Sequence, residues 1–575
     1  DGTKVARSAQ KPKASLKLSN IFGYVGRHAT GPSLAYTRSG EAVYHVASVA
    51  VVGDLESKQQ RFFQEHDNSI TALALHPFEN MVATGQRVPK GSMIRPVVLL
   101  WDPFTMEIRA RLELGPGHAF VCALGFCGAE GEFLVTVSGN EEHTIRLWDW
   151  REGAVLSELP TKQGSEQPLI YGVRSNPYPL PPGATLSERR TRAELVVFGD
   201  NCLLFYWLNA ETNELERVDP SSGNCSLDVV FRDVCFLRSG HVIAAGSNGQ
   251  LSIFYDGQGV QQIVNAHDPE QQSFHVGGIR SMRTAPSELM IRGHAEMDVV
   301  EIVTAGADGI VRQWELKLED FPTDLAAAKA PQPMVVRKQI PDLPHGQENV
   351  DASTLLYRPS IVSLDIPYEH DSQKILVGDA AGCIWELDDQ NDADSQLLFA
   401  GHAGDVMDVA AHPIRSSLCA TTGTDGCVYV WHISQQQHQL VRKIRLPVGG
   451  GESGETLRAW KCSFSSDGTM LAVSTAGIVG RAGAAENVDG PLPYSMPPVE
   501  GSSVVVLDVG ELLCISDDDV CSVQFYCNYC HKTATNIVCE QCNSWCADGL
   551  AVGKAEPRRI CELDDVGMIE VLRFS

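Results

Sequence analysis

Four cysteines near the end of the chain have the spacing of a metal site. In the segment CNYCHKTATNIVCEQCNSWC (527–546), Cys527 and Cys530 are followed by Cys539 and Cys542 as a second pair of the same spacing. Two such pairs of thiolates can supply the four sulfur ligands of a tetrahedral structural Zn²⁺ ion. We therefore predict that these four residues bind zinc, with scattered reduced cysteines as the alternative.

A zinc site of this kind is structural, because all four ligands come from the protein and no coordination position is left for a substrate. His531 and Cys546 lie in the same segment and could substitute as ligands. The segment interrupts an apolar strand pattern. We therefore interpret residues 521–562 as a cysteine-rich insertion on a larger fold, which resembles a degenerate B-box or a small treble-type zinc module.

A second set of residues combines a histidine with a carboxylate. In GHAGDVMDVAAHPIRSSLCATTGTDGCVYVWHI (401–433), His402, Thr422, Asp425 and Trp431 have the order of a buried hydrogen-bond chain. A histidine and an aspartate could also form a catalytic pair. Partial versions of the set recur along the chain, which favours a structural network that joins the strands of one sheet. These versions are His66 with Trp101, His118 with Trp148, and Asp308 with Trp314.

No other catalytic pattern occurs in the sequence. The stretch GLAVGK (549–554) is one residue short of a phosphate-binding loop and lacks the Ser or Thr that follows its lysine. Neither G-x-S-x-G nor H-E-x-x-H is present. We predict that the chain is not an enzyme.

The histidine and tryptophan sets belong to a unit that repeats along the chain. Each unit has an alternating apolar strand, a second strand of small residues, a tight turn with Asp or Asn and Gly, and a third strand with a large apolar landmark. The shorter spacings, such as 47 residues from Trp101 to Trp148, fit the roughly 40–45-residue blade of a WD-repeat propeller. The landmarks are Trp101, Trp148, Trp207, Phe254, Trp314, Trp385, Trp431 and Leu507.

This period predicts an all-β chain of tandem, atypical WD-repeat β-propellers, the second of them incomplete, with a small zinc-binding insertion. A chain of 575 residues also exceeds what one hydrophobic core supports. We place the boundary between the propellers in the polar stretch 321–347, which could instead be a long loop between two blades. The predicted domains are a basic tail (1–14), a hydrophobic motif (15–60), a first propeller (61–345) and a second, partial propeller (346–575) that carries the insertion.

Charge and hydropathy limit the classes of partner. The formal net charge of −26 argues against binding to nucleic acid or to an anionic membrane, since both need clustered cations. No apolar run is long enough to span a bilayer. The basic segment 1–17 is either a solvated tail or a tether to an acidic surface. Most of the 17 cysteines are scattered in apolar runs, as is typical of a reducing compartment.

The beginning of the chain resembles the echinoderm microtubule-associated protein-like family. In that family a hydrophobic motif of the form YGYRG precedes a strand that begins with Gly-Glu. Phe22 stands where the motif has its first tyrosine, and Val25 stands where it has arginine. The matching residues are Phe22, Gly23, Tyr24, Gly26 and Arg27, then Gly40, Glu41, Tyr44 and Ala47, then ALALHPFENMVATGQ (72–86).

The resemblance implies that this motif packs into the seam between two tandem propellers, with Phe22 and Tyr24 as the seam residues. The composition agrees, because Ile21, Phe22 and Tyr24 are too apolar for an exposed arm and too few for a core of their own. An ordinary propeller strand is the alternative.

The resemblance also implies a function. It predicts a microtubule-associated scaffold that binds tubulin or the microtubule lattice, with other cytoskeletal or axonemal proteins as further partners and with neither nucleic acid nor membrane as a partner. The expected location is the cytoplasm and cytoskeleton, and more finely the axoneme of a cilium or flagellum. The alternative is a WD-repeat adaptor for signalling or ubiquitin machinery that docks partners through its zinc insertion.

Overall fold

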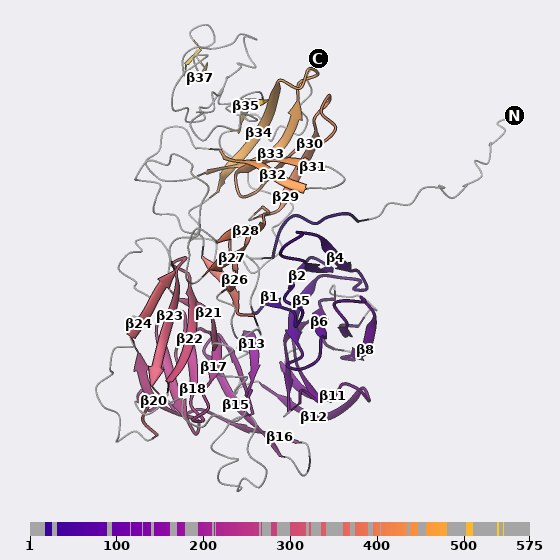
Figure 1. Ribbon diagram of the computed structural model, residues 1–575. Helices are drawn as coiled ribbons and strands as arrows, with labels where there is room; N and C mark the ends of the chain where they lie inside the picture. Colours follow the sequence, from indigo (N-terminus) through magenta and orange to yellow (C-terminus); the bar gives the residue numbers. More distant parts are fainter. Residues whose placement is uncertain are drawn as a thin grey trace, which may run out of the picture.

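The chain folds into antiparallel sheets whose strands pair in sequence order, as the computed structural model in Figure 1 shows. This confirms the predicted all-β propeller class. The structure describes residues 18–25, 31–88, 95–115, 117–128, 130–139, 143–161, 169–178, 194–209, 212, 214–263, 266, 278–284, 299–317, 321–323, 335–340, 360–367, 374–388, 395–402, 404–433, 438–446, 456–479, 502–509, 538–539 and 544–545.

Seven four-stranded sheets, here called blades 1 to 7, come first in the chain. Blades 1 to 4 are β1–β4 (Leu34–Tyr36, Ala42–Val46, Val49–Gly53, Gln60–Phe63), β5–β8 (Ile70–Leu75, Val82–Gln86, Val97–Trp101, Ile108–Glu113), β9–β12 (Val121–Cys127, Phe133–Ser138, Thr144–Asp149, Ala154–Pro160) and β13–β16 (Ile170–Ser175, Leu195–Gly199, Cys202–Asn209, Glu214–Val218). Blades 5 to 7 are β17–β20 (Phe231–Phe236, Val242–Gly246, Leu251–Tyr255, Gln258–Ile263), β21–β24 (Ile279–Thr284, Val299–Gly306, Val311–Lys317, Val335–Ile340) and β25–β28 (Ile361–Asp365, Lys374–Asp379, Ile384–Asp388, Gln396–Phe399).

Two further sheets and one short hairpin follow. Blade 8 is β29–β32 (Val406–Ala411, Leu418–Gly423, Cys427–Ile433, His438–Arg445), and blade 9 is β33–β35 (Thr456–Phe464, Met470–Val479, Ser502–Asp508). The hairpin pairs β36 (Val538–Cys539) with β37 (Ser544–Trp545). All eight predicted landmarks lie on the third strand of a blade, on β7, β11, β15, β19, β23, β27, β31 and β35.

The first seven blades close into one propeller. The first strand of blade 7, β25, packs against β21 of blade 6 on one side and against β1 of blade 1 on the other. The propeller therefore runs from residue 34 to residue 399. This differs from the predicted bounds of 61–345, because residues 34–63 form a complete blade and residues 361–399 supply the blade that closes the circle.

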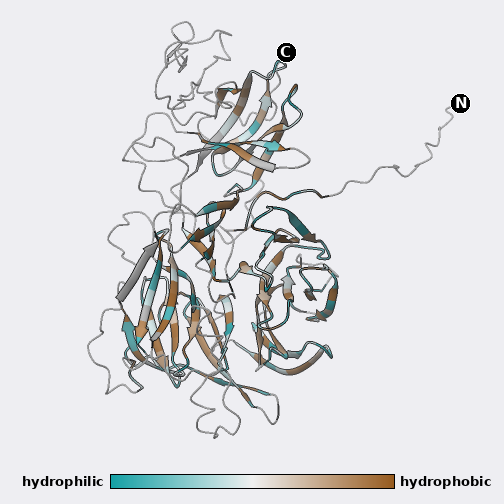
Figure 2. Cartoon of the chain, viewed as in Figure 1, coloured by the Kyte–Doolittle hydropathy of each residue, from teal (hydrophilic) through white to brown (hydrophobic). Residues whose placement is uncertain are grey.

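The burial of the strands follows their place in a blade. All five residues of β7, VVLLW, are buried, whereas β8 at the outer edge of the same blade is mostly exposed. Figure 2 shows the same gradient, with brown inner strands and more teal outer ones. The inner strands are continuous apolar runs because the neighbouring blades bury both of their faces.

Blade 8 is packed between blades 7 and 9. Its third strand alternates, so that Cys427, Tyr429 and Trp431 share one buried cluster with residues of blades 6 and 7. The intervening Val428 and Val430 belong to another cluster with blade 9. The chain after the first propeller is therefore attached to it through a continuous apolar core.

Candidate functional site

The hydrophobic motif at residues 21–25 lies where blades 1, 7 and 8 meet, which we call the junction. The ring of Phe22 is 4.3 Å from the ring of Trp431 in blade 8, measured between centroids. Tyr24 is buried with residues of blades 1 and 7, among them Tyr44 and Phe399. Two aromatic rings, two residues apart in sequence, thus fill different gaps in the same junction.

The backbone of the motif is fixed as closely as its side chains. The Gln60 amide accepts from the Ile21 N–H at 2.8 Å and donates to the Ile21 carbonyl at 3.0 Å. Gly23 has a φ of +124°, and a Cβ built on Gly401 would lie 2.1 Å from the Gly23 Cα. The positive φ favours glycine at position 23, and the close approach of the two backbones leaves no room for a side chain at position 401.

The hydrogen-bond network of blade 8 uses a different hydroxyl from the one that the sequence predicts. The Nδ1 atom of His402 is 3.1 Å from Asp425 and its Nε2 atom is 2.8 Å from the Thr421 Oγ1. The Trp431 indole donates to the same Thr421 oxygen at 2.9 Å. Thr422 instead donates to the Trp460 carbonyl of blade 9 at 3.4 Å.

Strand alternation explains this correction. Across the sheet, Thr421 pairs with Tyr429, which shares a face with Trp431, whereas Thr422 pairs with Val428 on the opposite face. Side chains of successive strand residues point to opposite faces, so Thr422 cannot reach the indole. The His402 and Asp425 side chains are 2% and 7% exposed. The contacts of His402 with Asp425 and with Thr421 lie within blade 8.

Other blades carry variants of the network. In blade 2, His66 and Trp101 both bond the Thr84 hydroxyl, at 2.7 and 3.1 Å, and Gln86 takes the place of the aspartate. In blade 3, His118 and Trp148 bond two separate hydroxyls, those of Ser138 and Thr136. In blade 6, Trp314 donates to Thr304, and Asp308 pairs with Arg312.

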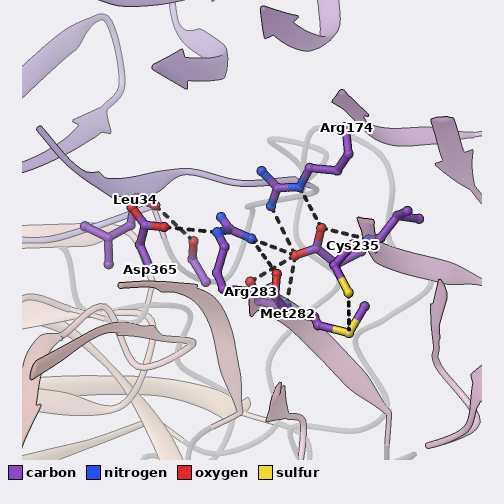
Figure 3. Close-up of polar contacts among 10 residues, drawn as sticks. Leu34, Arg174, Cys235, Met282, Arg283 and Asp365 are labelled. Carbon is purple, nitrogen blue, oxygen red and sulfur yellow. Dashed lines mark hydrogen bonds and ion pairs between the residues drawn. The ribbon is translucent and has the colours of Figure 1, made fainter. Parts of the chain in front are cut away.

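A chain of charged side chains connects the inner strands of blades 4 to 7, and Figure 3 shows its contacts. The Arg174 guanidinium lies 2.8 Å from one oxygen of Asp233, and the Arg283 guanidinium lies 3.0 Å from the other. Arg283 also contacts Asp365 at 3.0 Å. The second Asp365 oxygen accepts from the Tyr36 N–H of blade 1 at 2.8 Å.

This chain of charges alternates in sign, and the pKa values reflect the pairing. Burial alone would raise the pKa of Asp233, but the guanidinium groups of Arg174 and Arg283 hold that pKa below its ordinary value. Sequence reasoning missed the chain. The available signal was a charged residue at the fifth position of three first strands, those of blades 4, 6 and 7, and an aspartate at the third position of the first strand of blade 5.

The predicted zinc ligands fall largely outside the described residues. Cys527, Cys530 and Cys542 lie outside them, and of Cys539 only the strand pairing with Ser544 is described. Within the described ranges, no group of three or more His, Cys, Asp and Glu side chains could hold a metal ion. A search of the same ranges for helices long and apolar enough to cross a membrane finds none.

Comparison with known proteins agrees with the geometry of the blades. Residues 59–320 match the model of the echinoderm microtubule-associated protein first beta-propeller, and residues 394–432 match the WD domain, G-beta repeat. Over these residues the chain is similar to the echinoderm microtubule-associated protein-like family. Human echinoderm microtubule-associated protein-like 2 is 25% identical over 82% of this chain, and the 77 kDa echinoderm microtubule-associated protein of Strongylocentrotus purpuratus is 27% identical over 45%.

The chain spans 61% of the length of that human relative and 35% of the sea urchin relative. Among solved structures, Sqt1 of Chaetomium thermophilum, bound to the N-terminus of ribosomal protein L10, is similar with 16% identity and a TM-score of 0.37. That similarity covers 72% of this chain and 95% of the other.

Proposed function

We propose that this protein is a member of the echinoderm microtubule-associated protein-like family and a microtubule-associated scaffold that binds tubulin, as free dimers or in the microtubule lattice. The observation that carries the proposal is the match of residues 59–320 to the first propeller of echinoderm microtubule-associated proteins. Propellers present rigid faces on which protein partners can dock. The junction supports a scaffold role, because it joins the first propeller and blade 8 through one core.

Long-range electrostatics oppose this association, since the chain carries a formal charge of −26 and tubulin is acidic as well. Binding must therefore depend on short-range contacts, in which apolar area and local cations act together. Such contacts are screened less by salt than long-range steering is.

One surface of blades 1 and 2 has these properties, and we call it the aromatic surface. Phe104 is 71% exposed and Phe78 is 46% exposed, in two loops at the same end of blade 2. The guanidinium of Arg61 lies 5.7 Å from the Phe104 ring centroid, and that of Arg38 lies 5.8 Å from the Phe78 ring centroid. Each arginine also donates to the carbonyl of the proline that precedes its phenylalanine.

Exposed aromatic rings beside arginine are the residue types that dominate protein interfaces. The arginines hold the rings at the surface, and Arg61 also pairs with the Glu41 carboxylate at 2.8 Å. We therefore place the tubulin contact on the aromatic surface.

Co-sedimentation with taxol-stabilised microtubules and size-exclusion chromatography with tubulin dimers test the proposal. We expect the natural chain in the microtubule pellet at low and moderate salt. The Phe78→Ser/Phe104→Ser variant should bind at least about tenfold more weakly. The control Val155→Ser removes an apolar side chain that is 43% exposed on blade 3, and it should bind normally. Absence of the natural chain from both tubulin complexes would refute the function, whereas normal binding by the double variant would refute only the contact surface.

We further propose the axoneme of a cilium or flagellum as the location. The long inserts between strands and the cysteine-rich insertion suit permanent contact with fixed neighbours, where many contacts offset the entropy of ordering. The test is extraction of isolated axonemes with detergent and then with high salt. Retention in the pellet supports the location, and release by detergent alone argues against it.

The cysteine spacing at 527–542 supports an adaptor role as the second candidate. Deleting residues 521–562 separates the two functions. If microtubule binding persists and other partners are lost, the insertion has its own docking role. If all captured partners remain bound, the adaptor role is refuted.

A further inference from the structure

Residues 31–33, just before β1, cross the central channel of the first propeller. Gly31 and Pro32 line two separate cavities among the inner strands. One cavity is bounded by blades 5, 6 and 7, and the other by blades 2, 3 and 4. Each leaves a volume of about 10 Å³, which is room for about one water molecule. The segment thus separates these two cavities.

The two ends of this crossing are fixed. At the tip, a Cβ built on Gly31 would lie 2.2 Å from the Tyr171 carbonyl oxygen of blade 4. At the base, the Tyr24 hydroxyl is hydrogen-bonded to the Ser33 hydroxyl, and Ser363 donates to the Leu34 carbonyl at 3.5 Å. The Tyr171 oxygen is a backbone atom of β13, at the register shift between Ile170 and Gly172, and it cannot turn away as the end of a flexible side chain could.

We propose that residues 31–33 are an intramolecular plug of the central channel, held shut by the Tyr24 hydroxyl. Tyr24 is also buried between blades 1 and 7 in the junction, so the same residue connects the channel to the packing of these two blades. A partner segment or small ligand can then enter the channel only when the plug moves. Movement of the plug and loosening of the junction are coupled through this one side chain.

The channel contains a native reporter of the plug. Cys122 lines the cavity of blades 2 to 4 and is 7% exposed. Cys235 in blade 5 is similarly buried, at 6% exposed, but lines neither cavity. Alkylation of Cys122 therefore reports opening of the plug, while Cys235 in the same molecule reports general unfolding.

The experiment is timed alkylation of the native, full chain with N-ethylmaleimide, quantified for each cysteine peptide by mass spectrometry. Tyr24→Phe keeps the ring in the junction and removes only the hydroxyl, so Cys122 should react about 3- to 10-fold faster, the change expected from losing one buried hydrogen bond. Gly31→Ala should have a larger effect because the backbone at the tip must shift. Cys235 should react at the natural rate in both variants.

Tyr206→Phe is the matched control. Tyr206 is a fully buried tyrosine of blade 4 whose hydroxyl has no hydrogen-bond partner among the described residues. It should leave the Cys122 rate unchanged. The proposal is overturned if Cys122 reacts quickly in the natural chain, if neither variant accelerates it, or if Cys235 accelerates in parallel. These outcomes are independent of tubulin binding.

Discussion

Replacing Asp233 with Asn should destabilise the first propeller more than any exposed charge substitution. The Asp233 carboxylate is 2% exposed and joins Arg174 and Arg283, whose side chains are 24% and 16% exposed. It also accepts from the Met282 N–H at 2.9 Å. Asparagine keeps the shape of the side chain but carries no negative charge, so Arg174 loses its carboxylate partner. Its amide NH₂ group also faces the guanidinium groups of Arg174 and Arg283, which are donors themselves.

The expected loss follows from this geometry. Removing one partner of a fully buried ion pair costs about 3–5 kcal/mol. Arg283 keeps Asp365, and both guanidinium groups have partial contact with water, so we expect a loss of about 3 kcal/mol in the free energy of unfolding. The control Glu113→Gln removes a carboxylate that is 51% exposed beside an equally exposed Arg111, and it should cost at most about 1 kcal/mol.

Urea unfolding followed by far-ultraviolet circular dichroism measures the difference, and its pH dependence provides a second check. The pKa of Asp233 lies below its ordinary value of 3.8, so its charged form stabilises the fold above that value. The stabilisation is lost as the pH falls through the pKa of the folded state. The gap between the natural chain and Asp233→Asn should therefore be full at pH 7 and shrink below about pH 4. Equal stability of Asp233→Asn and Glu113→Gln at pH 7 would refute the reasoning.

Three further outcomes are expected. Thr421→Val should lower the unfolding free energy by about 1–3 kcal/mol, because the Trp431 indole loses its acceptor. Thr422→Val should lower it by less than about 1 kcal/mol. Reversed effects of the two variants in urea titrations would contradict the network. Burial and the nearby His66 lower the pKa of His45 to about 4, so the folded state holds this side chain neutral. The free energy of unfolding should therefore be highest above about pH 6.5 and fall by about 3 kcal/mol as the pH drops toward 4. His45→Gln should flatten this part of the curve of stability against pH. Cys527→Ser should remove one zinc per chain by atomic absorption, and an unchanged metal content would rule out this ligand.

The repeat unit could be predicted from the sequence because residues close together in the chain carry its signals. Alternating apolar residues, Asp-Gly turns and large apolar third strands are local, and the eight landmarks therefore identified the third strands correctly. The bounds of the first propeller are not local. Blade 7 closes the circle by packing against β1, more than three hundred residues earlier in the chain, and nothing within residues 361–399 specifies that neighbour.

The same distinction holds for single residues. The sequence by itself determined that a histidine, a hydroxyl, an aspartate and Trp431 would meet in blade 8, because these types recur in order. Only the tertiary structure decided between Thr421 and Thr422, since strand register assigns each to a face and a one-residue shift exchanges the faces. It also decided that Asp233 would lie between two arginines from neighbouring blades, and that Gly31 would reach across the channel to Tyr171. Such contacts join residues distant in sequence, and they exist only once the blades have closed around a common axis.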